Sequence, residues 1–267
     1  MGILQEIAVR TKERIALLKQ TLSLEAVIEA AAVYPVDKTF AFEQALRTDD
    51  IAFICEIKKA SPSKGVIAEE FDYLKIALDY ETAGAQAISV LTEPHYFLGS
   101  DHYLKKIAGV VKTPILRKDF VVDSYMIYQT KLLGASAVLL ICSLLNIKTL
   151  AEYIAIANSL GLSALVEAHD EAEVQMALSA GARVIGVNNR DLETFEVDIS
   201  TSENLRQLVP ADVLFVAESG IHTPEDIDRL RELGADAVLI GESIMRSVDK
   251  KAEIDRLRGY QQGARQW

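Results

Sequence analysis

Polar and charged side chains stand at the ends of apolar runs that have the composition of buried strands. Glu56 and Lys58 lie two positions apart at the end of the first run. Because side chains alternate along a strand, this carboxylate and this ammonium point to the same face. Later runs end in a further lysine, two carboxylates and an amide, at Lys118, Glu167, Asn188 and Glu218. If the runs are neighbouring parallel strands, all six side chains meet at one edge of the sheet, where such sheets hold their reaction sites.

This set of side chains could transfer protons. A lysine that is shielded from water or crowded by another lysine has a lowered pKa, and a nearby carboxylate can hold or return a proton. Taken singly, each charge could equally belong to a structural salt bridge. Taken together, the charges favour catalysis, because desolvating so many of them seldom stabilises a fold more than apolar packing does.

Glycines at the ends of the last two runs indicate an anion site. Ser219 and Gly220 follow Glu218, and Gly241 stands directly before Glu242, each pair preceding a helical segment. Glycines let an anion approach the backbone N–H groups, and helix N-termini add partial positive charge, so barrels commonly bind phosphate at this place. A single glycine here would indicate only a turn, whereas two on neighbouring strands predict a phosphate site.

Other residues are expected at the same edge. Arg190 and the segment 61–65, which begins with Ser61, would add a cation and hydroxyl groups to the phosphate site. Phe97 and Phe120 follow the second and third runs. Each alone is more often a packing residue, but together they could hold a flat ring.

The elements that must position these residues repeat along the chain. Five segments begin with a glycine that suits the end of a helix and continue as a buried strand, from Gly84, Gly134, Gly161, Gly181 and Gly234. Three more strand-like runs bring the count to eight, at Ile51 to Lys58, Thr113 to Phe120 and Ala211 to Ser219. The near-continuous hydrophobicity of these runs is typical of parallel strands that are covered on both faces.

Helical patterns fill the spaces between the strands. They are predicted over Tyr73–Ala83, Asp101–Val110, Ser124–Leu133, Asn146–Leu160, Glu171–Ala180, Ser202–Val209 and Pro224–Leu233. The expected N-caps are Asp123, Asp170, Ser200 and Thr223. Alternating strands and helices without a hairpin signal predict the α/β class and a single (β/α)8 (TIM) barrel. An open doubly wound sheet is the alternative, but the first strand is not followed by the glycine-rich turn that it favours.

The chain is predicted to have three parts. Residues 1–47 show helical periodicity over Ile3–Lys19 and Leu24–Ala32 but no strand, so they are expected to form an N-terminal helical extension that covers one end of the barrel. Residues 48–258 form the barrel. Residues 259–267 are polar and are expected to be a frayed tail.

Composition excludes several classes of function. The net charge of −11 and the lack of a basic stripe argue against nucleic-acid binding. No apolar run approaches the ~20 residues of a membrane span, and the first residues lack a targeting signal, so a cytoplasmic location is expected. Cys55 and Cys142 lie in apolar runs and are expected to be small buried hydrophobes. The four histidines show no metal-binding spacing, so no metal site is predicted.

Six motifs carry a resemblance to a known family. The segments EIKKASPSKG, LRKDF, LVEAH, VNNRDL, AESGI and LIGESIM stand in the order found in indole-3-glycerol phosphate synthases. The helical extension and the segment TEPHYFLGS also match, so the resemblance covers almost the whole chain. It implies ring closure of 1-(2-carboxyphenylamino)-1-deoxyribulose 5-phosphate with loss of carbon dioxide and water, without a cofactor or metal.

The resemblance also implies roles for the residues. Lys118 is similar to the general acid that protonates the ribulose carbonyl oxygen, and Glu167 to a residue of the acid–base machinery, assisted by Glu56 and Asn188. Lys58 would hold the substrate carboxylate and could donate a proton during dehydration. The sequence leaves open which lysine acts in which step.

The remaining residues of the resemblance would bind the substrate. Glu218 is similar to the family's carboxylate that positions the substrate hydroxyl groups and ring. Phosphate would be held by Ser61, Arg190, Ser219, Gly220, Gly241 and the backbone of Glu242, and the aromatic ring by Phe97, Phe120 and Leu139. Glu242 replaces the serine of many relatives, so its carboxylate must turn away from the phosphate.

Two alternatives remain at this point. One is a different phosphate-handling barrel, such as a Schiff-base aldolase that uses Lys58 or Lys118. The other is a sugar-phosphate binder that has lost turnover, against which the complete set of lysines and carboxylates argues. A monomer that acts on a small phosphorylated anion is expected in either enzyme.

Overall fold

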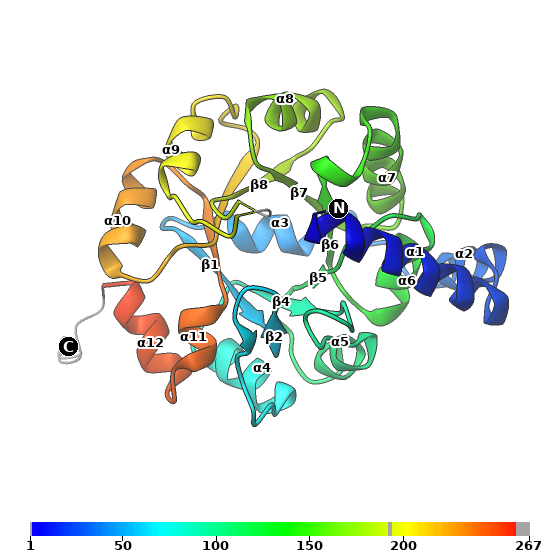
Figure 1. Cartoon of the computed structure of the whole chain (residues 1–267), viewed down its shortest axis with the longest axis horizontal. Helices are drawn as coiled ribbons and strands as arrows, with labels where there is room; N and C mark the ends of the chain where they lie inside the picture. Colours follow the sequence, from blue (N-terminus) through cyan, green and yellow to red (C-terminus); the bar gives the residue numbers. More distant parts are fainter. Residues whose placement is uncertain (1, 192–193, 260–267) are drawn as a thin grey trace.

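Eight parallel strands close into a barrel in the computed structural model, which describes residues 2–191 and 194–259. The strands lie in the order β1-β10-β9-β8-β7-β6-β5-β4, and β1 pairs with β4 to complete the ring (Figure 1). Their bounds are β1 Ala52–Ile57, β4 Ala87–Leu91, β5 Ile115–Lys118, β6 Ala137–Ile141, β7 Ser163–Ala168, β8 Val184–Asn188, β9 Leu214–Glu218 and β10 Ala237–Ile240. The predicted barrel is confirmed, and the alternative of an open sheet is wrong.

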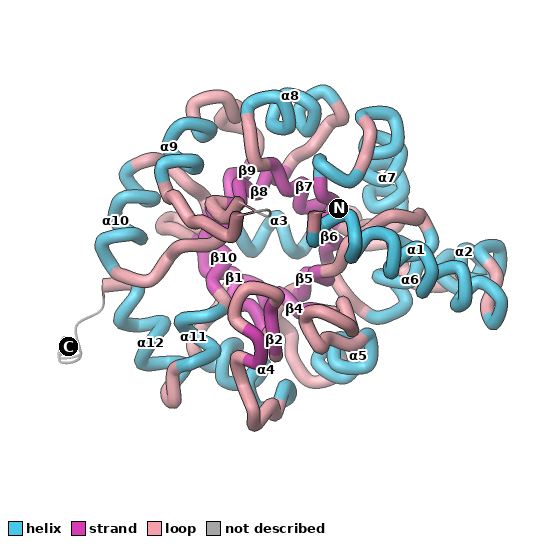
Figure 2. Tube along the Cα trace, viewed as in Figure 1, coloured by secondary structure: helices cyan, strands magenta, loops and turns pink. Residues whose placement is uncertain are grey.

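Helices surround the ring of strands on the outside (Figure 2). They are α4 Tyr73–Thr82, α5 Asp101–Ala108, α6 Tyr125–Leu133, α7 Ile147–Ser159, α8 Glu171–Ser179, α9 Ser200–Arg206, α10 Pro224–Glu232, α11 Glu242–Arg246 and α12 Lys250–Leu257, with a 3-10 turn η1 at Cys142–Leu144. The helix predicted over Ser202–Val209 starts and ends too late, and α12 was not predicted. The five glycines of the repeated pattern all have positive φ, as expected of residues that end a helix.

Two of the four predicted N-caps are confirmed. The Asp170 carboxylate accepts a hydrogen bond from the N–H of Glu173 at 2.8 Å at the start of α8. Thr223 forms a capping box with Asp226 at the start of α10, in which each side chain accepts a hydrogen bond from the other residue's backbone N–H. These side chains satisfy N–H groups that have no partner within the helix.

The other two predicted caps are each wrong by one position, because the N-caps are Ser124 and Ile199. Ser200 is the first residue of α9, and its N–H donates to the Asp198 carboxylate at 2.9 Å. Ser124 is the N-cap of α6, while Asp123 before it accepts from the N–H of Tyr125 at 2.9 Å. In both cases the aspartate two positions before the first residue of the helix accepts a hydrogen bond from the backbone N–H of that residue.

The N-terminal extension contributes to both ends of the barrel. It contains α1 Ile3–Thr21, α2 Leu24–Ala32 and a short helix that was not predicted, α3 Ala41–Leu46. Phe42 and Leu46 of α3 are buried against the residues that begin five strands, Ala52, Ala137, Val184, Leu214 and Ala237. The helix α3 therefore closes the amino end of the barrel, where Figure 2 shows it in the middle of the ring. The division of the chain at residue 47 stays a prediction.

A small hairpin follows the first strand, although no hairpin signal was found in the sequence. Its strands, β2 Ala60–Ser61 and β3 Gly65–Val66, pair antiparallel in the loop between β1 and α4. Gly65 has φ of 65°, which a glycine adopts without steric cost. The hairpin places Ser61 beside the carboxyl end of β1.

The alternation of side chains on the strands divides the core into two layers. Ile54 packs inside the barrel, whereas Phe53 and Cys55 pack outside it against the helices. Cys55 and Cys142 are both buried and free, as predicted. None of the described helices is long and apolar enough to cross a membrane.

Candidate active site

One pocket at the carboxyl ends of the strands is lined by every site residue that the sequence predicted. The pocket has a volume of about 160 Å³. Its lining includes Glu56, Lys58, Ser61, Phe97, Lys118, Phe120, Leu139, Glu167, Asn188, Arg190, Glu218, Ser219, Gly220, Gly241 and Glu242. The barrel thus brings together residues that are up to 186 positions apart in the chain.

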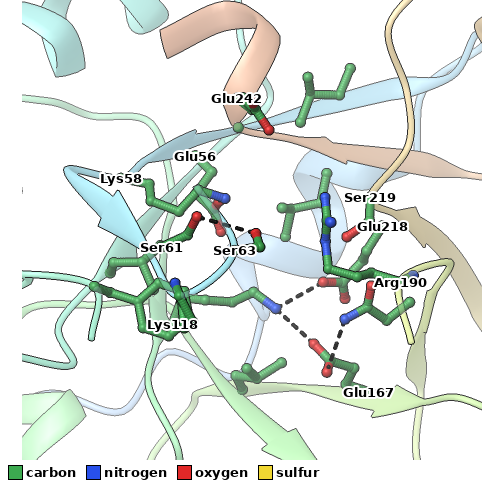
Figure 3. Close-up of a pocket in the computed structure, with 18 of the residues that line it drawn as sticks. Glu56, Lys58, Ser61, Ser63, Lys118, Glu167, Arg190, Glu218, Ser219 and Glu242 are labelled. Atoms are coloured by element: carbon green, nitrogen blue, oxygen red, sulfur yellow. Dashed lines mark hydrogen bonds and ion pairs between the residues drawn. The ribbon is translucent and has the colours of Figure 1, made fainter. Parts of the chain in front are cut away.

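Lys118 lies between two carboxylates in the centre of this pocket (Figure 3). Its Nζ donates at 2.8 Å to Oε2 of Glu167 and at 2.8 Å to Oε2 of Glu218. The three residues come from β5, β7 and β9, and alternate strands of a barrel supply side chains to the same layer. Their side chains are 12%, 3% and 2% exposed, so the interaction takes place almost without solvent.

The pKa of Lys118 is raised rather than lowered. Burial by itself would lower the pKa of this ammonium, but the charges of Glu167, Glu218 and Glu56 outweigh that effect. The prediction of a lowered lysine pKa is therefore wrong for Lys118. That prediction took account of shielding from water and of nearby lysines, but not of Glu167 and Glu218, which contact the ammonium. Lys118 is an ammonium at neutral pH and can act as a proton donor.

The two carboxylates that contact Lys118 differ in proton affinity. Burial raises the pKa of both, and Lys118 lowers both. For Glu167, hydrogen bonding and charge from His169 add to the effect of Lys118, and the pKa falls well below its ordinary value. For Glu218, the negative charges of Glu167 and Glu56 add to burial and raise the pKa to about 7. Such a divided pair can provide one permanent anion and one group that exchanges protons near neutral pH.

Glu56 and Lys58 form a second pair on the rim of the barrel. Lys58 Nζ donates to Glu56 Oε1 at 2.5 Å, and the two side chains are 19% and 5% exposed. Glu56 lies on β1 and Lys58 directly follows this strand, and the prediction that both side chains point to the same face is confirmed. Lys58 extends into the pocket from the side opposite Glu167 in Figure 3.

Two glycines make room for carboxylates that line the pocket. A Cβ added to Gly186 on β8 would lie 2.2 Å from Oε1 of Glu218, and one added to Gly241 would lie 2.5 Å from Oε1 of Glu56. Gly186 was not singled out from the sequence. The available signal is that a glycine inside a strand often marks a place where another group approaches closely.

The predicted anion site has an unusual backbone. Ser219 and Gly220 both have positive φ, at 67° and 79°, and the Ser219 carbonyl accepts a hydrogen bond from Nδ2 of Asn189 at 3.2 Å. A non-glycine residue in this conformation carries strain, which is found most often at functional sites. The chain therefore turns sharply where β9 ends.

The carboxylate of Glu242 lies near two cationic side chains. Its Oε1 lies 3.1 Å from Nε of Arg246 and 4.0 Å from Nζ of Lys64. The carboxylate is therefore neutralised locally by the helix α11 and by the β2–β3 hairpin. This arrangement fits the expectation that only the backbone of Glu242 faces an anion.

An apolar wall faces the charged residues. The rings of Phe97 and Phe120 are 5.8 Å apart between centroids. Three residues of α1 that were not predicted, Ile3, Leu4 and Ile7, also line the pocket. Sequence patterns could not have assigned them, because they show only that α1 has an apolar side.

An ion pair connects α1 to the residue that follows β5. Nη2 of Arg14 donates at 2.9 Å to each oxygen of Asp119, the residue that follows Lys118. Asp119 also accepts from Thr92 at 2.7 Å and from the fully buried Arg117 at 3.4 Å. The position of α1 over the pocket is therefore linked to the end of β5.

Fold and site together define a (β/α)8-barrel enzyme with a lysine–carboxylate centre. A family model described as indole-3-glycerol phosphate synthase matches residues 4–257. The chain is 58% identical to an indole-3-glycerol phosphate synthase of Ruminiclostridium cellulolyticum, over 96% of this chain and 99% of that protein. It is 52% identical to that of Endomicrobium trichonymphae, over 92% of this chain and 95% of that protein. The chain belongs to the indole-3-glycerol phosphate synthase family.

Solved structures support the fold at low sequence identity. A 3-hexulose-6-phosphate synthase from Salmonella typhimurium superposes with a TM-score of 0.64 at 16% identity, covering 79% of this chain and 98% of that one. A mutant tryptophan synthase alpha-subunit from Pyrococcus furiosus gives 0.61 at 15% identity, with the same coverage. At these identities the likeness concerns the barrel alone.

Membership of the family establishes the activity. The protein is a carboxy-lyase of tryptophan biosynthesis that closes the indole ring of its anilino-ribulose phosphate substrate, with loss of carbon dioxide and water. The sequence alone had left a Schiff-base aldolase and a binder without turnover as alternatives. Neither agrees with relatives of this identity.

Proposed function

We propose that Lys118 is the general acid of ring closure. The ring carbon that bears the carboxylate attacks C2 of the ribulose chain, and the C2 carbonyl oxygen takes a proton from Lys118 Nζ as the new C–C bond forms. The bond to the carboxylate then breaks, carbon dioxide leaves, and the electron pair returns to the ring. The contact of Lys118 with two buried carboxylates is the observation that supports this role most strongly.

The carboxylates beside Lys118 restore its proton and complete the dehydration. Glu218, with a pKa of about 7, is ionised in the form that holds Lys118, and after ring closure it can take up a proton from solvent and pass it to Lys118. Glu167 is an anion until the dehydration step. It then accepts the proton lost from C1 when the hydroxyl group leaves C2 as water. Asn188 Nδ2 lies 3.4 Å from Oε1 of Glu167 and assists in orienting it.

The second lysine binds the carboxylate of the substrate. In this proposal Lys58 holds the benzoate group and donates the proton that converts the C2 hydroxyl into water. Glu56, whose Oε1 lies 2.5 Å from Nζ of Lys58, orients this ammonium. Separate lysines for ring closure and dehydration fit the positions of the two ammonium groups, at the end of β5 and directly after β1.

Phosphate and ring occupy different sides of the pocket. Backbone N–H groups of Ser219, Gly220, Gly241 and Glu242 would bind phosphate, with Ser61 and Arg190 closing over it. The anthranilate ring lies between Phe97, Phe120 and Leu139, against the residues of α1 that complete the apolar wall. The dianionic phosphate thus meets N–H dipoles and a guanidinium group in a protein whose net charge is −11.

Several expectations from the sequence belong to the same proposal. The reaction needs no metal or cofactor, and the protein acts as a cytoplasmic monomer that does not bind nucleic acid. The N-terminal extension, residues 1–47, serves the barrel as a cover and is not an independent domain. The frayed tail predicted for 259–267 falls, apart from Gly259, outside the described residues.

Replacement of Lys118 by alanine tests the central role. Lys118→Ala is expected to lower turnover of the anilino-ribulose phosphate by about 10²-fold or more, the scale of positioned proton transfer, while the far-UV circular dichroism is unchanged. Lys112→Ala, at an exposed position just before β5, is the matched control and should turn over normally. Near-normal turnover of Lys118→Ala would show that another group is the acid.

A further inference from the structure

One of the four histidines, none of which shows a metal-binding spacing in the sequence, lies against the carboxylate of Glu167. His169 follows Glu167 by two residues, just beyond the end of β7. Its Nε2 is 3.4 Å from Oε1 of Glu167, and its Nδ1 is 2.9 Å from Oε2 of Glu173 on α8. The other three histidines, His95, His102 and His222, are exposed.

The imidazole is fixed by the start of α8. Glu173 Oε2 accepts from the backbone N–H of His169 at 2.8 Å as well as contacting its Nδ1. The N–H of Glu173 in turn donates to Asp170, the N-cap of the helix. Because both ends of this contact are anchored by backbone groups, the ring has a defined orientation with Nε2 toward Glu167.

The imidazole has no other partner on the side of the active site. Nε2 is buried and makes no aligned hydrogen bond among the described residues, so its contact with Glu167 is an ion-pair contact at 3.4 Å. The side chain of His169 is 20% exposed, and that of Glu167 is 3% exposed. A small rotation of the Glu167 carboxylate would complete the hydrogen bond.

The charges around the ring favour its cationic form. Burial alone would lower the pKa of His169, but the hydrogen bonds and charges of Glu167 and Glu173 outweigh it and raise the pKa to about 10. Other charged groups close to the ring are Asp170 on α8 and, across a shallow cavity formed by the segment after β8, Arg190, Asp191, Glu196 and Asp198. Cations and anions therefore alternate from Lys118 through Glu167 and His169 to Glu173.

We propose that His169 is a positioning residue that holds the Glu167 carboxylate with Oε2 toward Lys118. Without the imidazolium, Oε1 of Glu167 keeps only the distant amide of Asn188, and the carboxylate can rotate away from the acid and the substrate. This inference deepens the proposed function, since it rests on the role of Glu167. A loss of orientation affects the transition state more than substrate binding, so it lowers kcat more than it raises KM.

Imidazole spectra of the 15N-labelled whole chain test the state of the ring. At about pH 8, both nitrogens of His169 should carry protons, which the 15N chemical shifts of the ring report directly. His169→Gln assigns the signal by its disappearance. A His169 ring with only one protonated nitrogen at about pH 8 would overturn the proposal.

Kinetics of matched variants test the positioning role. His169→Leu should lower kcat by about 10-fold or more with KM changed by less than about 3-fold, and His169→Gln should recover part of the loss because its amide N–H can still reach Glu167. Glu173→Gln should lower kcat less than His169→Leu does. Wild-type kcat in His169→Leu, or equal losses in the Leu and Gln variants, would overturn the proposal.

Glu167→Gln separates this inference from the proposed function. If Glu167→Gln abolishes turnover while His169→Leu keeps it, only the role of His169 is wrong. If Glu167→Gln turns over normally, the role assigned to Glu167 is wrong and the inference fails with it. Loss of turnover in Glu167→Gln together with the graded losses at His169 supports both.

Discussion

Each end of the barrel pairs a basic side chain with glutamate, but the two pairings differ in how they are built. At the amino end, Arg183 donates from Nε and Nη2 to the two oxygens of Glu43 at 3.0 and 2.7 Å, and its guanidinium lies 4.2 Å from the centroid of Phe40. At the carboxyl end, a single lysine is shared by Glu167 and Glu218. Oε1 of Glu218 is buried without a hydrogen-bond partner among the described residues.

The difference lies in how completely the charges are satisfied. In the arginine–glutamate pair, each oxygen of Glu43 accepts a hydrogen bond from Arg183, and α3 closes this end of the barrel. The Glu43 carboxylate therefore has no oxygen left for a ligand. The lysine centre keeps an acceptor without a donor and opens onto a pocket. Incomplete pairing of buried charges is costly for stability, and here it occurs at the end of the barrel that carries the pocket.

The largest effect in this comparison is expected from an added methyl group beside Glu218. Gly186→Ala would place Cβ 2.2 Å from Oε1 of Glu218, so the carboxylate must move and its contact with Lys118 is lost. Because the displaced atoms end a flexible side chain, the fold should tolerate the change. Turnover should fall by about 10²-fold, as expected for a misplaced catalytic group, in steady-state assays.

The matched control for this variant is Gly109→Ala. Gly109 follows α5 at an exposed position where an added Cβ meets no atom closer than 3.4 Å. It should leave turnover unchanged. Full activity of Gly186→Ala would show that turnover tolerates displacement of the Glu218 carboxylate. The incomplete pairing of charges around Lys118 would then have no role in catalysis.

A smaller and purely structural effect is expected at the amino end. Arg183→Leu removes the partner of the buried Glu43 and should lower the free energy of unfolding by about 1 to 3 kcal/mol, the cost of an unsatisfied buried acceptor. Denaturant titration measures this loss, and kcat should stay at the wild-type value. A fall in kcat without a change in stability would mean that the amino end takes part in catalysis.

Local sequence patterns predicted the strands and the residues at their ends. The alternation of Glu56 and Lys58, and the polar ends of the apolar runs, are set by the strand itself, so these residues could be assigned without coordinates. Family resemblance added the ligand roles, including Leu139, which no pattern marks as part of a site.

Features that depend on packing between distant segments were missed. The side of α1 that faces the pocket, at Ile3 and Ile7, is fixed by the contact of Arg14 with Asp119. The role of Gly186 appears only when Glu218 from the neighbouring strand is placed beside it. The direction of the pKa shift of Lys118 was predicted wrongly for the same reason, because the shift depends on carboxylates from two other strands.

The proposed chemistry depends on the position of Lys118 between two buried carboxylates of different proton affinity. The most direct test is the pH dependence of kcat/KM for the wild type and for Glu218→Gln. Burial, together with the negative charges of Glu167 and Glu56, raises the pKa of Glu218 to about 7, although Lys118 opposes them, and the ionised form is the one that holds Lys118. The wild-type rate should therefore fall as the pH drops through about 7.

In Glu218→Gln this limb should disappear and the plateau should be lower. The limb of the substrate phosphate, whose second pKa is about 6, should remain in both proteins. If Glu218→Gln keeps a limb near pH 7 and a wild-type plateau, Glu218 does not share the proton of Lys118, and the proposed centre is contradicted.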